Sequence, residues 1–219
     1  MSAILLTSTD PHPPDCPAFN YESDPRRGTL LGARVDEILI ALLRGDIDTR
    51  NFVLDTRPLH HRLFVGLTPV NCDYYAGHYR GEPFRCLQHY RVMVPSDPRV
   101  GPPPVAVQHN LTELASIIRS GLDALEGGPP LSGRDRLRYL IVFACRAFEI
   151  FLRVHPYANG NGHAARLMIW CVLGRYGHWP RRWTVEPRPP DPPYSDLIRR
   201  YRDGDKNPLE LFVASMLVP

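Results

Sequence analysis

The sequence contains no apolar run long enough to cross a bilayer and no marked excess of one charge. A membrane-spanning helix needs about 20 consecutive apolar residues, and the 219 residues include no such stretch. The N-terminal MSAILLTSTDPHPP has a short apolar run and no basic region before it, unlike a secretory signal peptide. The 26 basic and 23 acidic residues are too nearly balanced to indicate nucleic-acid binding. We therefore expect no nucleic-acid partner and no membrane partner.

The spacing of the cysteines matches no metal or redox motif. The five cysteines are an odd number and include no CxxC pair. Cys145 and Cys171 fall inside apolar helical patterns, where a reduced thiol behaves as a small hydrophobic side chain. This usage favours a protein of the reducing cytoplasm. An effector exported by a specialised secretion system would show the same pattern.

Apolar residues and prolines, by contrast, are plentiful. With 43% hydrophobic residues the chain can form a core, whereas its 24 prolines cluster in segments that we expect to be loops. Residues 1–30 are Pro-rich, show little apolar periodicity and predict an irregular arm. Residues 31–219 predict one mainly α domain, because helical periodicity dominates there.

Several segments repeat their apolar side chains at helical spacing. The best pattern covers 136–153; it follows Ser132 and Asp135, which resemble a capping box, and ends before His155-Pro156. Further helices are predicted at 31–43, 111–122, 162–176 and 207–217, with a short one within 46–54.

One segment alternates instead of following a helical period. In FRCLQHYRVMV, residues 84–94, most of the apolar side chains would share one face of a strand. A turn signal follows at Ser96-Asp97-Pro98, and the prolines at 102–104 exclude the returning chain from the centre of a sheet. We therefore predict a small β-hairpin over about residues 82–104.

The residues with chemical potential concentrate in HPYANGNGHAAR, residues 155–166, between two strongly predicted helices. Gly160-Asn161-Gly162 lets consecutive backbone N–H groups face one point at the start of the second helix, which makes an anion site. Arg166 follows about one turn later on that helix. His155 approaches from the end of the preceding helix. The combination predicts a phosphate site with a base beside it.

Each of these residues alone has an ordinary explanation. A histidine at the end of a helix is usually a partner of the helix dipole, and a Gly-Asn-Gly run is usually only a turn. His155, Asn159 and His163 are spaced by four, as in some metal sites, but a third strong ligand and an HExxH pattern are lacking. Their occurrence together within twelve residues favours the phosphate site.

The segment closely resembles the active-site motif of the Fic family, His-Pro-Phe-x-(Asp/Glu)-Gly-Asn-Gly-Arg-x-x-Arg. Three positions differ, since Tyr157 replaces phenylalanine, Asn159 replaces the acidic residue and His163 replaces the first arginine. The resemblance implies a mainly α fold, a Fic-type helical bundle in which the motif loop joins two helices.

Looser similarity extends over about residues 31–219. Gly77-His78-Tyr79-Arg80 resembles an element that precedes the β-hairpin flap of the family, and the prolines at 102–104 resemble those that close it. Tyr194 and the predicted helix at 208–217 resemble C-terminal elements of the family. The resemblance therefore implies that the hairpin at about 82–104 is the flap.

The resemblance also implies an activity, the transfer of a nucleoside monophosphate, commonly AMP from ATP, to a hydroxyl side chain of a target protein. His155 would deprotonate that hydroxyl, and Arg166 would neutralise the outer phosphates. The flap would bind the target segment as an added strand. The implied cofactors are ATP or another nucleoside triphosphate and Mg²⁺, for which Asn159 is a weak ligand because it is uncharged. The other implied phosphate-binding residues are Gly160, Asn161, Gly162 and His163.

Two other functions stay open. An imidazole at 163 binds phosphate less firmly than a guanidinium, so a catalytically silent Fic-like protein that binds a nucleotide or a partner is the main alternative. Family members also move phosphate or phosphocholine, so the transferred group is a second open point. The self-inhibitory pattern Ser/Thr-x-x-x-Glu-Gly/Asn is missing. Glu126-Gly127 matches its end, but Leu122 stands at the position of the Ser or Thr. This implies a separate inhibitory partner, or none.

Overall fold

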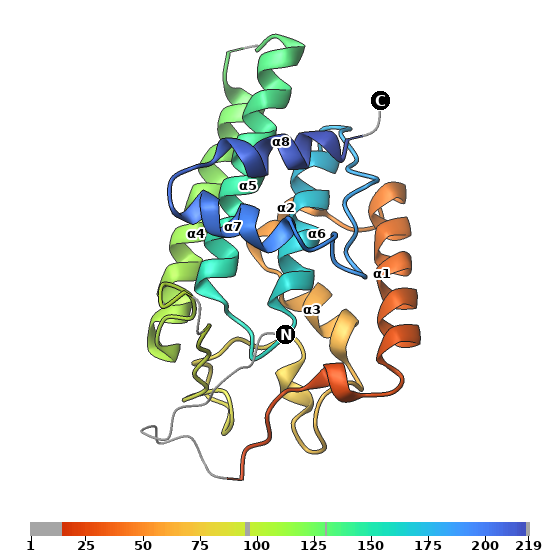
Figure 1. Ribbon diagram of the computed structural model, residues 1–219, viewed down its shortest axis with the longest axis vertical. Coiled ribbons are helices and arrows are strands. Elements are labelled where there is room, and N and C mark those ends of the chain that lie inside the picture. The colour runs from red at the N-terminus through yellow and green to blue at the C-terminus, as the bar shows by residue number, and fades with distance from the viewer. Residues whose placement is uncertain (1–14, 95–96, 130, 218–219) are drawn as a thin grey trace.

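The computed structural model describes residues 15–94, 97–129 and 131–217, which form a mainly helical fold (Figure 1). None of these residues lies in a strand. Among the described helices, none combines the length and the apolar character that crossing a membrane requires. The helices are α1 (Arg27–Arg44), α2 (Thr49–Leu54), α3 (Arg57–Phe64), α4 (Pro104–Gly127), α5 (Gly133–Val154), α6 (Asn161–Gly174), α7 (Tyr194–Arg202) and α8 (Asn207–Ser215), with short 3₁₀ helices η1 (Tyr21–Ser23) and η2 (Asp73–Tyr75).

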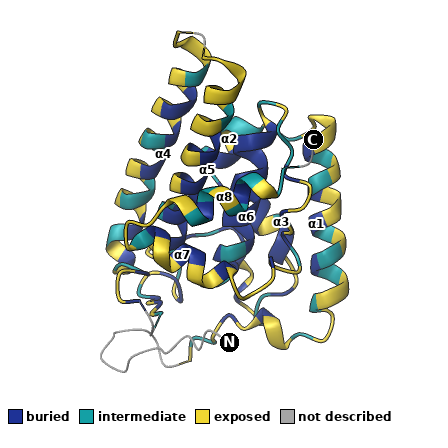
Figure 2. Ribbon diagram, turned by 45° about the horizontal axis from the view of Figure 1, so that its top comes forward, coloured by how far each residue is buried: buried dark blue, intermediate teal, exposed yellow. Residues whose placement is uncertain are grey.

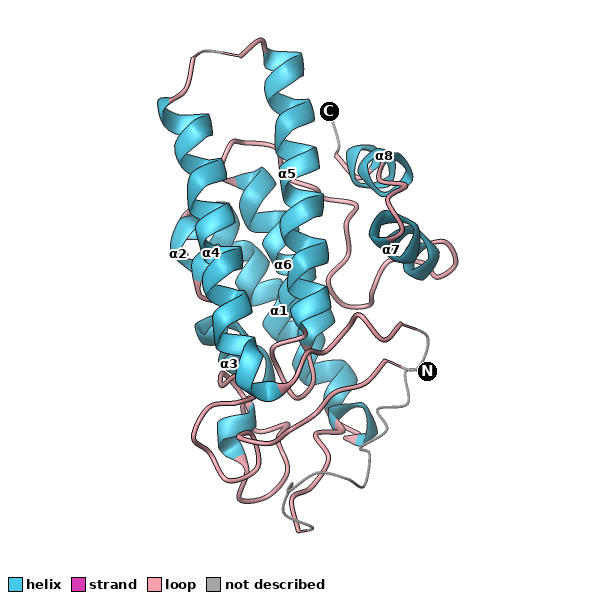
Figure 3. Cartoon of the chain, turned by 90° about the vertical axis from the view of Figure 1, so that its left-hand side faces the viewer, coloured by secondary structure: helices cyan, strands magenta, loops and turns pink. Residues whose placement is uncertain are grey.

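Helix α6 lies at the centre of the molecule. Every residue of this helix except Gly162 is buried, as Figure 2 shows by colour. Helix α5 packs along α6 and is covered by α4, while α1, α2 and α3 also contact α6. Helices α7 and α8 lie side by side against α5, seen clearly in Figure 3. The start of α6, where the motif lies, is therefore held from several sides.

The strongest sequence patterns correspond to helices in the structure. Helix α5 begins after Ser132, whose Oγ accepts a hydrogen bond from the Asp135 N–H at 3.2 Å, so the predicted cap is confirmed. Helices α3 and α7 were not predicted. Both are short, and α3 has a proline in its first turn, so neither shows a long apolar stripe. Helix α4 begins at Pro104 and α1 at Arg27, each earlier than the periodicity indicated.

The β-hairpin predicted over about residues 82–104 is wrong for the part of it that the structure describes. Residues 84–89 form successive turns, and the returning chain enters α4 directly. Tyr90 and Val92 are buried, as the alternation predicted, but they pack on the helical core. The Gly101 N–H donates to the Arg153 carbonyl at 2.9 Å, and so bonds to the end of α5. Alternation identified the residues that face the core without specifying a strand partner.

The side chain of Arg80 donates hydrogen bonds to carbonyl groups of this irregular segment. It is 1% exposed, and burial lowers its pKa to about 10, so the guanidinium stays charged at neutral pH. Nε donates to the His155 carbonyl at 2.8 Å and Nη2 to the Val154 carbonyl at 3.2 Å, at the open end of α5. Nη1 donates to the carbonyls of Tyr90 at 3.1 Å and Pro102 at 3.3 Å. One side chain thus joins the 80–102 segment to the motif.

A disulfide joins the N-terminal arm to this segment. Cys16 and Cys86 are bonded across 70 positions of sequence. The expectation of a reducing compartment does not account for this pair, because stable disulfides are typical of oxidising compartments. Cys145 and Cys171 are free and buried, as their positions in apolar patterns predicted. Residues 1–14 of the predicted arm lie outside the described residues.

Replacement of Arg80 by methionine should lower the free energy of unfolding by about 3–5 kcal/mol, because several buried carbonyl groups would lose their donor at once. Urea denaturation followed by circular dichroism measures this loss. Arg44→Met, at an exposed position at the end of α1, is the matched control and should change stability by less than about 1 kcal/mol. Equal unfolding midpoints for the two variants would show that Arg80 does not stabilise the segment.

Candidate active site

His155 lies just after α5 in a left-handed conformation, with φ 51° and ψ 59°. This conformation costs a residue with a side chain about 1 kcal/mol or more. Two hydrogen bonds from Arg80 hold this turn. Its Nε donates to the His155 carbonyl, and the Arg80 backbone N–H donates to the Pro156 carbonyl at 2.8 Å. The turn brings the imidazole to the wall of a cavity that the start of α6 also lines.

The hydrogen bonds of His155 define its tautomer. Nδ1 lies 3.2 Å from the Leu152 carbonyl oxygen, and because a carbonyl can only accept, Nδ1 carries the proton. Nε2 therefore carries the lone pair. Burial, followed by the nearby charge of Arg80, lowers the pKa of His155 to about 4. At neutral pH this side chain is a neutral imidazole that can accept a proton at Nε2.

The loop between the two helices is held by its own side chains. Asn161 is buried; its Oδ1 accepts from the Tyr157 N–H at 2.8 Å, and its Nδ2 donates to the Tyr157 carbonyl at 2.9 Å. Gly160 has φ 77°, and a Cβ there would overlap the Phe64 ring. The side chain of Asn161 thus shapes the loop, and only its backbone N–H remains to bind an anion.

A histidine that sequence analysis did not identify supports this loop from α3. The Gly77 N–H donates to His60 Nδ1 at 3.0 Å, so His60 Nε2 carries the proton and donates to the Asn159 carbonyl at 2.9 Å. Its ring stacks on Tyr157 with centroids 3.6 Å apart, and the Tyr157 hydroxyl is 2.6 Å from the Thr56 hydroxyl. Burial lowers the pKa of His60 to about 3, so this ring is neutral.

The start of α6 presents backbone donors to the cavity. The N–H groups of Asn161 and Gly162 have no hydrogen-bond partner within the ranges that the structure describes. The guanidinium of Arg166 lies against Gly162, where an added Cβ would be 2.9 Å from Nη1. Arg166 Nε donates to the Val185 carbonyl at 2.9 Å, which fixes this largely buried side chain. Donors, helix dipole and cation therefore converge as the motif predicted.

His163 is placed differently from a cation that binds phosphate. Its ring is 4% exposed and contacts the edges of Tyr21 and Phe64. Nε2 lies 2.7 Å from Glu186, which also pairs with Arg27 at 2.9 Å. Burial lowers the pKa of His163 to about 4, and the hydrogen bond from His163 lowers the pKa of Glu186. Both pKa shifts fit a neutral His163 imidazole that donates a hydrogen bond to an ionised Glu186 carboxylate.

Asn159 connects the motif to the N-terminal arm. Its Oδ1 accepts from the Gly160 N–H at 2.8 Å. Its Nδ2 donates to the Phe19 carbonyl at 2.8 Å and lies 3.0 and 3.2 Å from the two carboxylate oxygens of Glu22. Neither Glu22 nor Glu186 was identified from the sequence, because both lie far from the motif along the chain and belong to no pattern.

Two adjoining cavities, of about 430 and 440 Å³, are both lined by residues of the motif. Glu22, Arg27 and Glu186 also line the first cavity, and Tyr194, Ser195 and Arg202 line the second. Each is large enough to hold part of a nucleotide-sized ligand. The residues that line both are Val94, His155, Gly162, Arg166 and Arg188.

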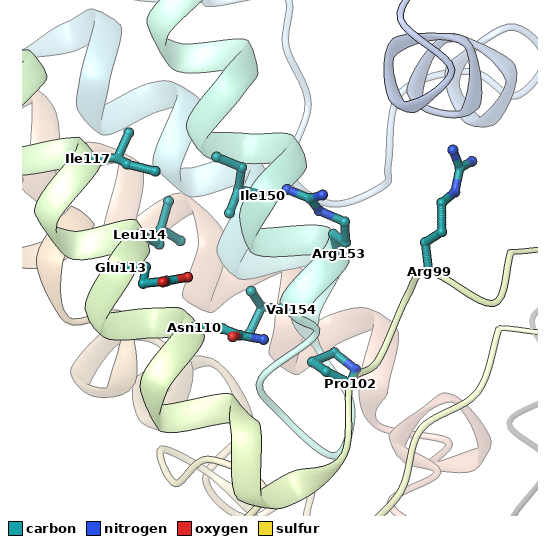
Figure 4. Close-up of a pocket in the computed structure, with 9 residues that line it drawn as sticks. All are labelled: Arg99, Pro102, Asn110, Glu113, Leu114, Ile117, Ile150, Arg153 and Val154. Carbon is teal, nitrogen blue, oxygen red and sulfur yellow. The ribbon is translucent and has the colours of Figure 1, made fainter.

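A third cavity, of about 310 Å³, lies between α4 and α5 (Figure 4). Glu113 and Asn110 face it from α4, and Arg153 faces it from α5. No motif residue lines it, and it has no histidine and no helix N-terminus. It therefore lacks the parts of a phosphate-transfer site, and we assign the candidate active site to the two cavities at the motif.

No protein-family model matches the chain, and no curated protein matches it significantly.

Three buried imidazoles make stability depend on pH. Folding lowers the pKa from 6.5 to about 3 for His60 and to about 4 for His155 and His163. The unfolded chain therefore takes up protons below pH 6.5 that the folded chain does not. The stability that the neutral rings contribute is complete above pH 6.5 and is lost as the pH falls toward 4.

We expect the free energy of unfolding to fall by more than about 2 kcal/mol between pH 7 and pH 4.5. Urea titrations across this range measure the change. His163→Gln keeps a donor for Glu186 but cannot be protonated, so its loss should be smaller than that of the wild type. His109→Gln, at an exposed position on α4, should keep the wild-type slope. An identical slope in all three proteins would contradict the assignment.

Proposed function

We propose that the chain transfers a nucleoside monophosphate, in the first instance AMP from ATP, to a hydroxyl side chain of a target protein. One observation carries this proposal: a single cavity brings together the proton-accepting Nε2 of His155, the backbone N–H groups at the start of α6 and the guanidinium of Arg166. Transfer to a hydroxyl from a nucleotide requires these parts, namely a base, an anion site and a fixed cation.

The reaction forms one phosphorus–oxygen bond and breaks another. The target hydroxyl oxygen attacks the α-phosphorus while its proton passes to Nε2 of His155. The bond from the α-phosphorus to the bridging oxygen breaks, pyrophosphate leaves, and a phosphodiester remains on the target. The α6 N–H groups and Arg166 stabilise the negative charge on the phosphates during this step. Because His155 is neutral at pH 7, the base is ready without a prior proton loss.

Mg²⁺, when bound with the nucleotide, would add positive charge beside the phosphates. Asn159 alone is a poor ligand for it, since its Oδ1 already accepts a hydrogen bond. Within the described part of the chain, no group of three His, Cys, Asp or Glu could hold a metal by itself. Mg²⁺ in phosphate sites commonly uses one or two carboxylates and takes its other ligands from phosphates and water. The site fits the ion in this respect, because the carboxylates of Glu22 and Glu186 line the cavity.

The target segment would lie along residues 92–94. Val92, Met93 and Val94 line the cavity that contains His155 and the start of α6. A hydroxyl side chain presented there would be close to Nε2 of His155. Since the described residues of this segment form no strand, we do not invoke addition of the target to a hairpin.

A silent nucleotide- or partner-binding protein is the second candidate, and one observation favours it. The carboxylates of Glu22 and Glu186 line the same cavity as the anion site, and negative charge there opposes a triphosphate. The position of a radiolabel on ATP separates the candidates. Label from the α-phosphorus marks nucleotidyl transfer, label from the γ-phosphorus marks phosphate transfer, and nucleotide binding without transfer supports the silent protein.

His155→Ala should abolish transfer of α-phosphorus label to protein acceptors, with a loss of about 10²–10⁴-fold in rate. Nucleotide affinity should change little, because a base acts on the transition state more than on the ground state. Label incorporation in a cell extract and calorimetric titration with ATP measure the two effects. The exposed His109→Ala variant should retain both properties. Undiminished transfer by His155→Ala would eliminate the proposed base.

Arg166→Ala should weaken nucleoside triphosphate binding by about 1.5–3 kcal/mol, the range for a hydrogen bond to a charged group. Calorimetric titration measures the affinity, and thermal denaturation verifies that the variant is folded despite the lost bond to Val185. Arg182→Ala, at an exposed position outside the cavities, is the matched control. Equal affinities of the folded Arg166→Ala variant and the wild type would exclude Arg166 from the phosphate site.

A further inference from the structure

The arm segment, residues 15–24, is fixed in place beside the candidate active site. The Cys16–Cys86 disulfide holds its start, and the Tyr75 hydroxyl donates to the Pro17 carbonyl at 2.9 Å. Phe19 is 1% exposed and packs among the rings of the core. These contacts determine where Glu22, on η1, lies relative to the motif.

Glu22 presents an accessible carboxylate to the cavity. The residue is exposed, and it lines the cavity together with His155, Gly160 and Arg166. Asn159 Nδ2 is 3.0 Å from one carboxylate oxygen and 3.2 Å from the other. An ionised carboxylate has about four lone-pair positions, so this amide leaves acceptor capacity for a further ligand.

The amide at position 159 is what allows this arrangement. A carboxylate there would lie against the Glu22 carboxylate and repel it, whereas the Asn159 amide donates to it. Glu186, the other acid in the cavity, is engaged differently, because one oxygen pairs with Arg27 and the other with His163. Glu22 is therefore the carboxylate in this cavity that can take up a cation.

We infer that Glu22 binds the divalent cation of the nucleotide complex, so that the charge missing at position 159 comes from the arm. This inference rests on the proposed nucleotide site. An uncompensated carboxylate beside the start of α6 would repel phosphate, and a divalent cation between the two converts the repulsion into a bridge. Glu22 would provide a protein carboxylate of the kind that a phosphate-bound Mg²⁺ commonly uses.

The test compares nucleotide affinity with and without metal. The probe is ATP with a methylene group between the α- and β-phosphorus atoms, titrated by calorimetry in Mg²⁺ and in EDTA, and Mn²⁺ binding to the complex is followed by electron paramagnetic resonance. In the wild type, metal should tighten binding by about tenfold or more. Glu22→Gln keeps an acceptor for Asn159 but loses the charge, and should lose most of this factor together with the Mn²⁺ signal of the ternary complex. Glu113→Gln on α4 removes an equal charge outside the two cavities at the motif and should behave as the wild type.

An exchange of the two residues provides the decisive variant. In Glu22→Gln combined with Asn159→Asp, the amide and the carboxylate trade places across the same contact, so metal dependence should return. The new carboxylate cannot donate to the Phe19 carbonyl, so thermal denaturation first verifies that the double variant is folded. An unchanged Glu22→Gln variant, tighter binding by that variant in EDTA and in Mg²⁺ alike, or no recovery in the double variant would each overturn the inference. Nucleotide binding by the wild type that ignores metal would overturn it while leaving the proposed function intact. A wild type that binds no nucleotide would overturn both.

Discussion

The guanidinium of Arg80, buried and surrounded by carbonyl oxygens, is the interaction on which the rest of the site depends. It supplies donors to the last carbonyls of α5 and to two carbonyls of the segment that returns to α4. The same group stabilises the left-handed backbone of His155, and so determines where the imidazole lies. A single charged side chain thereby provides hydrogen-bond donors to four carbonyl groups of irregular backbone.

Around that centre, the site is built from neutral imidazoles and amides. His60 and Asn161 use both of their polar atoms to hold the loop, and His163 donates to Glu186. Such fully bonded groups reorganise little when charge develops nearby, which is the condition for electrostatic stabilisation of a transition state. The charge available to a ligand then comes from Arg166, the start of α6, the acids at the cavity rim and further arginines that line the two cavities, Arg188 among them.

Local patterns explain which features could be predicted. Helices α5 and α6 have long apolar stretches, and the motif residues between them are adjacent in sequence, so their convergence followed from helix geometry alone. Helix α3 is too short to show a period, and the alternation at 84–94 reports burial without identifying a partner. His60, Glu22 and Glu186 reach the motif only through tertiary packing. A single sequence gives no local signal for such contacts. The Cys16–Cys86 disulfide could not be predicted either, because the two cysteines are 70 positions apart.

The enclosure of α6 has a consequence for how this protein can diversify. Since every residue of the helix except Gly162 is buried, a substitution there alters the core and the chemistry together, and few can be accepted. The arm segment, residues 92–94 and residues 186–188 line the same cavity from loops and short turns, which tolerate exchange far better. We therefore expect relatives of this chain to share the reacting groups. Their ligand preferences would differ through substitutions in these three segments. Sequence variation at the site would then concentrate in the segments that surround the motif and not in the motif itself.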